Sequence, residues 1–159
     1  VQHLATFVSY VRARPSKRYE EKEHRELSFR LISQFVRLAK FMAVVLNRPT
    51  VDDEVMRRVR WVALDTARGR TLELLKRLYS WEEGLETPAA TASLYYSEES
   101  EKKLLYFLRS IKALSYSTPI VEKEQAGGVL GSIGSVRPRP RWKLTPRLRC
   151  LYERVYTDA

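Results

Sequence analysis

The sequence predicts a mainly α-helical fold in two parts, with a small β element in the second part, on three observations. Apolar residues recur every three or four positions through most of the 159 residues, which is the period of a helix buried along one face. Proline, glycine, serine and aspartate mark where these helices start and stop. Strand-like residues occupy only 114–121 and 142–144. We therefore expect a helical bundle over residues 1–69 and a second domain over residues 70–159.

The first two helices of the bundle are predicted from their apolar faces. Residues 4–11 place apolar side chains at helical spacing, and Pro15 should stop that helix. A longer helix follows an apolar stripe through residues 31–46. Phe41 and Val44 lie off this stripe, so we expect the longer helix to be buried on more than one side.

The third helix follows a break at residues 47–49. Residues 50–53 supply an N-cap and an acidic first turn, which suits the positive end of the helix dipole. Gly69 is the expected C-cap. The predicted inward face consists of Val55, Val59, Val62 and Thr66.

The second domain has the element order of a winged helix-turn-helix: three short helices, a strand, a loop, a second strand and a closing helix. The letters SEES at 97–100, LLYFL at 104–108 and AL at 113–114 resemble the recognition helix of that superfamily and the strand after it. The letters WKLTP at 142–146 resemble its return strand and the start of its last helix. The predicted elements are helices from Thr71 to near Gly84, from Pro88 to Tyr95 and from Ser97 to Ile111, strands at 114–121 and 142–144, and a last helix from Thr145 to Val155.

The charge balance favours a polyanion as partner, because 29 Lys and Arg face 19 Asp and Glu, a formal net charge of +10. Nucleic acid, an anionic membrane surface and ribosomal scaffolds are all compatible with such a charge. Half of the excess falls after residue 136, where proline alternates with arginine. The seven cations of that segment are Arg137, Arg139, Arg141, Lys143, Arg147, Arg149 and Arg154.

The predicted wing is the first candidate for nucleic-acid contact. A two-stranded ribbon can follow a phosphate backbone while a helix enters the major groove. We therefore assign DNA contact to Arg137, Arg139, Arg141 and Lys143, against the alternative of a solvated basic loop. The glycine-rich residues 127–134 are interpreted as the tip of the wing, because they lack the Gly-Lys-Ser/Thr ending of a phosphate-binding loop.

The predicted recognition helix is a weaker candidate. Lys102 and Lys103 are its only cations in the first two turns, and three glutamates crowd its N-terminus. Sequence-specific reading by this helix is therefore disfavoured, and a protein-docking role is an alternative. Tyr95, Tyr96 and Tyr106 are expected to pack rather than to stack on bases.

Three segments of the first part resemble minichromosome-maintenance (MCM) replicative helicases. The letters LATFVSYVR at 4–12 resemble the helix after the ATPase core of that family. SFRLI at 28–32 and VRLA at 36–39 are similar to the helix with its sensor-2 arginine, and VDDEV at 51–55 with VR at 59–60 to the next helix. A winged helix follows in that family too. The letters LIS at 31–33 depart from the family pattern, which indicates a divergent relative.

This resemblance implies the lid of an AAA+ ATPase followed by a winged helix, within a helicase that acts in DNA replication. Arg30 would be the sensor-2 arginine, reaching the γ-phosphate of ATP held mainly by a neighbouring subunit of a homo-hexamer. ATP and Mg²⁺ would belong to the ATPase core of the parent protein. A replication protein such as a primase or loader is a possible further partner of the winged helix.

The sequence also predicts what this chain does not do. It has no Walker motifs, so we expect it neither to hydrolyse ATP nor to act as an enzyme alone, and no catalytic set stands out. A metal site is not expected, since Cys150 is the single cysteine and His3 and His24 lie far apart. The lone cysteine and the short apolar stretches predict an intracellular protein without a membrane span, cytoplasmic in a prokaryotic or viral host and nuclear in a eukaryote.

Two alternatives to the helicase interpretation stay open. A free-standing winged-helix transcription regulator would use its first three helices for dimerisation or for binding an effector. A winged-helix module that docks a protein would not need its cations for DNA. The salt dependence and specificity of DNA binding separate these possibilities.

Overall fold

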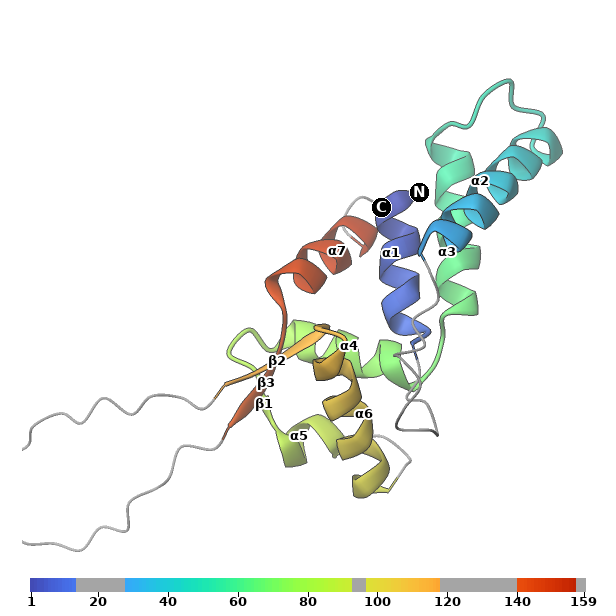
Figure 1. The fold of residues 1–159 in the computed structure, drawn as a ribbon. Helices are drawn as coiled ribbons and strands as arrows, with labels where there is room; N and C mark the ends of the chain where they lie inside the picture. The colour runs from blue at the N-terminus through green and yellow to red at the C-terminus, as the bar shows by residue number, and fades with distance from the viewer. Residues whose placement is uncertain (14–27, 93–96, 118–139, 157–159) are drawn as a thin grey trace, which may run out of the picture.

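A computed structural model describes residues 1–13, 28–92, 97–117 and 140–156 of the chain. Helices dominate these ranges, and the strands form one three-stranded antiparallel sheet (Figure 1). The mainly α fold class is thereby confirmed. The elements are α1 (Gln2–Val11), α2 (Ser28–Val45), α3 (Asp53–Thr66), α4 (Arg70–Ser80), β1 (Leu85–Glu86), α5 (Thr87–Thr91), α6 (Glu98–Ser110), β2 (Leu114–Ser117), β3 (Arg141–Leu144) and α7 (Pro146–Tyr156).

Helix α1 lies between the α2–α3 pair and α7 (Figure 1). It has no charged residue in its first or last turn, and every residue from Leu4 to Val11 except Thr6 is buried. A helix that is apolar on nearly all sides needs partners on more than one side. Residues 4–11 therefore form the helix that the sequence predicts, with more of its surface buried than one apolar face requires.

Helices α2 and α3 pack along narrow stripes of residues spaced four apart. On α2 these residues are Leu31, Phe35, Ala39 and Ala43, and on α3 they are Val55, Val59 and Ala63. The prediction that α2 is buried on more than one side is wrong, because Phe41 is 71% and Val44 77% exposed. The physical reason is rotation: Phe41 follows Ala39 by two residues, about 200° around the helix.

The ends of α3 also correct the sequence prediction. The Val55 amide donates to Asp52 Oδ1 at 2.9 Å, so Asp52 is the N-cap. Val62 and Thr66 are exposed, and Ala63 and Ala67 take the inward places instead. Gly69 is not the C-cap, because Ala67 ends α3. Gly69, with φ 140°, is the N-cap of α4, which begins directly after it.

The second half contains a strand that the sequence did not reveal. β1 is two residues long and pairs with β3, Leu85 opposite Trp142, so the strand order is β1-β3-β2. Two residues carry too little periodicity to mark a strand. β2 pairs with β3 in register, Leu114 opposite Leu144, and α6 and α7 match the predicted helices. Helix α5 ends at Thr91, and residues 93–96 and 118–139 lie outside the described ranges.

Trp142 is the centre of the sheet's buried face. It is 1% exposed, and its Nε1–H donates to Thr87 Oγ1 at 2.9 Å. The ring lies against Tyr106 of α6 and Tyr116 of β2, with centroids 5.4 Å and 4.4 Å away. Successive side chains of a strand point to opposite faces, so Trp142 and Leu144 face the core while Arg141 and Lys143 face outward. Trp142 therefore fixes the direction in which the cations of β3 point.

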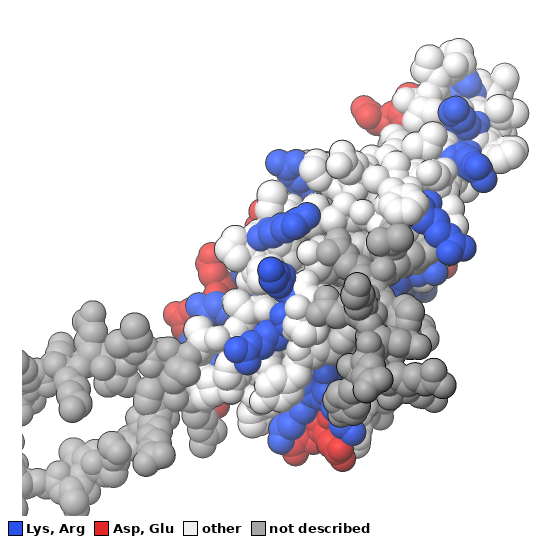
Figure 2. All heavy atoms as spheres, in the orientation of Figure 1, with Lys and Arg blue, Asp and Glu red and all other residues white. Residues whose placement is uncertain are grey.

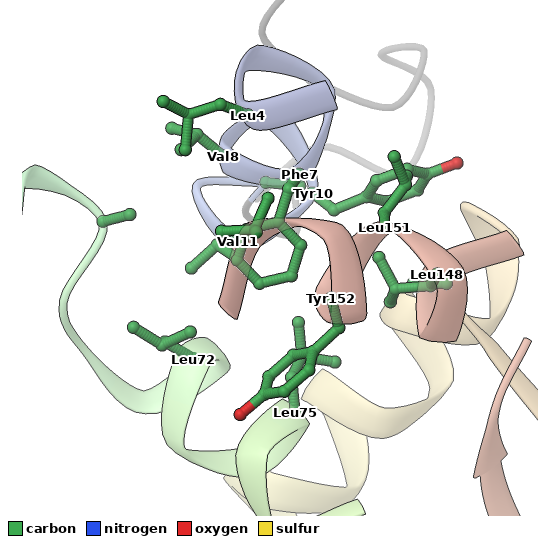
Figure 3. Packing of buried hydrophobic residues seen from close by; sticks show 14 of the residues in the cluster. Leu4, Phe7, Val8, Tyr10, Val11, Leu72, Leu75, Leu148, Leu151 and Tyr152 are labelled. Atoms are coloured by element: carbon green, nitrogen blue, oxygen red, sulfur yellow. The ribbon is translucent and has the colours of Figure 1, made fainter. Parts of the chain in front are cut away.

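The hydrophobic core runs across residue 69, where the sequence predicts a domain boundary. Phe7 of α1 meets Tyr152 of α7 edge-on, with ring centroids 5.9 Å apart, and Tyr152 stacks on Tyr79 of α4 at 4.2 Å. In Figure 3 the labelled side chains of α1 converge with those of α4 and α7. The boundary itself stays a prediction, but α1 contributes to the core on both sides of it.

Replacing Phe7 by alanine should lower the free energy of unfolding by about 3–5 kcal/mol, because Phe7 is completely buried. Urea denaturation of the whole chain measures this change. Phe41→Ala is the matched control: the same side chain is removed from an exposed position, so a change within about 0.5 kcal/mol is expected. Equal effects of the two variants would contradict the burial of α1.

Candidate nucleic-acid interface

The outward face of α6 carries cations that are already paired within the helix. Lys102 Nζ lies 2.6 Å from Glu98 Oε1, and Lys103 Nζ lies 2.8 Å from Glu99 Oε1. The bond to Glu98 raises the pKa of Lys102, and the bond to Lys103 lowers the pKa of Glu99. All four side chains are solvent-exposed, so each pair is weak and can exchange for a phosphate. As folded, however, the first turns of α6 present a balanced surface rather than a basic one.

Further along α6, Tyr106 and Arg109 complete this outward face. Tyr106 is 54% exposed, although its ring also contacts Trp142, so it is half packed as the sequence predicts. The Arg109 guanidinium lies over the ring of Tyr116 with 5.4 Å to the centroid. Arg109 was missed by the sequence reasoning, although its place at the end of the helix, where a cation suits the dipole, was a usable signal.

Strands β2 and β3 form an antiparallel hairpin, and within its described part Arg141 and Lys143 lie on the same face of β3. Arg141 Nη1 lies 3.0 Å from Glu83 Oε2, and Glu83 is well exposed. Lys143 lies against Gly84, where an added Cβ would come within 2.6 Å of Lys143 Cγ. Gly84 therefore allows the Lys143 stem to cross the backbone after α4, with φ +85° also favouring glycine there. Arg137 and Arg139 lie outside the described residues, as do the glycine-rich residues 127–134 and Tyr95 and Tyr96.

Arg30 belongs to a different part of the molecule from these cations. It lies in the first turn of α2, exposed, beside Phe29, which is 65% exposed. Helix α1 separates α2 from α7 in Figure 1. The structure therefore brings Arg141 and Lys143 together but does not bring Arg30 to them.

A buried ion pair lies beneath the start of α6. Glu101 is 0% exposed, and Arg70 Nε lies 3.2 Å from its Oε1, while Arg70 also donates to Ser100 Oγ and to the Ser100 carbonyl at 2.9 and 2.8 Å. The Glu101 oxygens lack hydrogen-bond geometry, so the pair is electrostatic only. Burial raises the pKa of Glu101, and the Arg70 charge opposes this rise. The pair joins the start of α4 to the first turn of α6.

No family model, curated protein or solved structure matches the chain. Within the described ranges, no cluster of three or more His, Cys, Asp or Glu residues is arranged to hold a metal ion. The same ranges contain no helix with the length and apolar composition needed to cross a membrane.

We predict that Glu101 makes the chain less stable as the pH rises. Its folded pKa lies above the ordinary value of 4.5, so its contribution is fully favourable below pH 4.5 and is lost as the pH passes the folded pKa. The free energy of unfolding of the wild type, relative to Glu101→Gln, should therefore fall from pH 4.5 upward. Urea denaturation across this range measures it.

Glu99→Gln is the control for this prediction. The folded pKa of Glu99 is lowered, so its contribution is present at higher pH and is lost as the pH falls. As the pH rises, the stability of the wild type relative to Glu101→Gln should therefore fall, while its stability relative to Glu99→Gln should rise. Slopes of the same sign would contradict the burial of Glu101.

Proposed function

We propose that residues 70–156 form a winged-helix DNA-binding module, and that the chain is the lid and winged-helix region of an MCM-like, ATP-dependent DNA helicase. One observation carries the proposal: the strand order β1-β3-β2, with α5 and α6 inserted between β1 and β2. This topology sets a helix beside a two-stranded ribbon, the pair of elements that can occupy a groove and a backbone of the same duplex.

The charges of the module support binding to the backbone rather than reading of bases. The first turns of α6 hold two lysines that are paired with glutamates, so little net charge faces a major groove there. On β3, Lys143 and Arg141 face outward, although Arg141 is paired with the exposed Glu83, and the sequence adds Arg137 and Arg139 just before them. Backbone binding is sequence-independent and depends steeply on salt. A motor that moves along DNA needs such binding.

The exposed surface of α2 supports the lid interpretation. A lid must lie against the ATPase core that it covers, and α2 offers an apolar surface for that contact. The exposed apolar residues of α2 are Phe29, Val36, Phe41, Val44 and Val45. Several large apolar side chains exposed along one helix suit a contact surface.

Arg30 stands at the start of this apolar surface, in the first turn of α2. A guanidinium keeps its charge and forms forked hydrogen bonds with phosphate oxygens, which suits a sensor of bound ATP. Its exposure beside Phe29 would let it reach a nucleotide held by a neighbouring subunit. In a ring, α1 would then link this arginine to the winged helix.

The ion pairs of α6 favour a second candidate, a winged helix that docks a replication protein. A helix whose exposed first turns carry both acidic and basic side chains can match a protein surface with the complementary charges. A free-standing transcription regulator would instead require sequence-specific contacts from α6, which its paired lysines do not favour. The DNA-binding experiment separates all three.

Replacing Arg137, Arg139, Arg141 and Lys143 by alanine should weaken duplex binding and lower the slope of log K against log salt. The slope should fall by about one for each cation that contacts a phosphate. Fluorescence anisotropy with a labelled duplex at several salt concentrations measures both quantities. The control removes four cations from α2 and α3 (Arg37, Lys40, Arg57 and Arg58) and should leave the slope unchanged.

An unchanged slope in the hairpin variant would overturn DNA contact by the wing and leave protein docking as the function. A specific sequence bound far more tightly than random duplex at physiological salt would instead identify a regulator.

Arg30→Ala, in a chain extended by its ATPase core, should lower the rate of ATP hydrolysis on the order of 10²–10³-fold. This is the effect expected when one hydrogen-bond donor to the charge that develops in the transition state is removed. Arg30→Lys is the matched variant: it keeps the charge and loses the fork, so it should recover only part of the activity. Steady-state ATPase and unwinding assays measure both. Wild-type rates in Arg30→Ala would exclude the sensor role.

A further inference from the structure

A groove runs along the outward face of α7, which none of the predicted site residues lines. It consists of two adjoining pockets of about 320 Å³ and 620 Å³, both lined by Arg147. The first lies between α1 and α7, with His3, Cys150 and Arg154 among its residues. The second lies between the end of α1, the turn after α6 and the start of α7, with Lys112 and Thr145.

The groove differs from the start of α6 and from Arg141 of β3 in that its cations are not paired with carboxylates of the described residues. Among the described residues, Lys112, Arg147 and Arg154 form no ion pair with a carboxylate, and no Asp or Glu lines either pocket. Figure 2 shows Lys and Arg side chains over α7. The three charges therefore act together on whatever enters the groove.

Lys112 occupies a backbone position that ordinarily belongs to glycine. It has φ 58°, and it follows the C-cap of α6 in a Schellman motif: its amide donates to the Arg109 carbonyl at 2.9 Å, and the Ala113 amide to the Leu108 carbonyl at 2.8 Å. A residue other than glycine or asparagine is strained in this left-handed conformation. The equivalent position after α2 holds Asn47, with φ 51°. A lysine in this conformation supplies a charge at the expense of stability.

Thr145 fixes Lys112 beside the start of α7. Its amide donates to the Ala113 carbonyl at 3.1 Å, and its hydroxyl lies 3.1 Å from the Lys112 carbonyl. The Leu148 amide in turn donates to the Thr145 hydroxyl at 3.4 Å. The turn after α6, the end of β3 and the first turn of α7 are thus joined at one residue, and the groove begins where the hairpin ends.

Arg147 and Arg154 stand two helical turns apart on α7, about 10.5 Å along its axis. A duplex rises about 3.4 Å per base pair along its axis, so a helix that lies along the duplex would span about three base pairs between these two arginines. At the far end, Arg154 Nη1 lies 2.7 Å from His3 Nε2, so the imidazole accepts from the guanidinium and holds it over the groove. The two guanidinium groups can therefore contact separate phosphates.

We propose that this groove binds the phosphate backbone of nucleic acid and continues the path of the hairpin along α7. The choice of nucleic acid as partner rests on the proposed function. The aromatic and large apolar lining residues, Tyr10, Ile111 and Leu151, are all buried, so no ring is offered to bases and no apolar side chain to a bilayer. Contact is therefore independent of base sequence.

The first test is duplex binding by the whole chain with Arg147→Ala and Arg154→Ala together. Near 0.1 M salt, affinity should fall roughly tenfold for each cation, and the salt slope by about one for each. Arg37→Ala with Lys40→Ala removes the same charge from α2 and should change neither quantity. Lys112→Gly should weaken binding while raising the melting temperature, which a merely unfolded variant could not do.

The second test uses Cys150, the single cysteine of the chain, which is exposed and lines the first pocket. Duplex DNA should slow its reaction with a maleimide in proportion to the fraction of protein bound. Denatured protein, with and without DNA, controls for any effect of DNA on the reagent.

The outcomes separate this proposal from the proposed function. DNA binding that leaves Cys150 reactive and survives Arg147→Ala/Arg154→Ala would overturn the groove and leave the wing intact. Binding lost in the groove variant and retained in the hairpin variant would support the groove and overturn the wing. No duplex binding by the wild type at low salt would overturn both.

Discussion

The burial of α1 between two groups of helices is the constraint on which the rest of the structure depends. Its side chains pack on α2 and α3 on one side and on α7 on the other. Phe7, fully buried, contacts the rings of Tyr152 and Tyr156, which tie α7 to the helix. Burial raises the pKa of Tyr156 to about 12, so its ring stays neutral in this apolar setting at ordinary pH. Without α1, neither the α2–α3 pair nor α7 would have a fixed partner across residue 69.

Helix α7 combines two tasks because its two faces are separated by sequence spacing. Leu148, Tyr152 and Val155 face the core, while Arg147 and Arg154, seven residues apart, lie along one edge of that face with the buried Leu151 between them. The half-buried Arg149 contacts α4, with its guanidinium 5.0 Å from the centroid of Tyr79 and 3.3 Å from the Tyr79 carbonyl. Since β3 runs into α7 through Thr145, a force on the hairpin would reach α1 through one short helix. This is the route by which the proposed lid and the proposed DNA contact would influence each other.

Sequence periodicity predicted the helices well, since α1, α2, α3, α6 and α7 follow their apolar spacing. The periodicity did not predict features that depend on one or two residues, such as where one helix ends and the next begins. Gly69 looked like a C-cap, but α4 starts directly after it, and β1 is too short to carry a period. Of the candidate site, Arg141 and Lys143 were found because they lie in a basic run, yet their pairing and packing depend on Glu83 and Gly84, about 58 residues earlier. The groove of Lys112, Arg147 and Arg154 needs three elements brought together, which no local pattern shows.

Amide hydrogen exchange of the whole chain, free and with bound duplex, tests the central claim most directly: that nucleic acid lies where the hairpin meets α7, on a scaffold held by α1. The account predicts slower exchange on binding in residues 110–113 and 141–154, and no change in α2 and α3. Slowing confined to α2 and α3 would contradict it, as would bound DNA that leaves residues 141–154 unchanged.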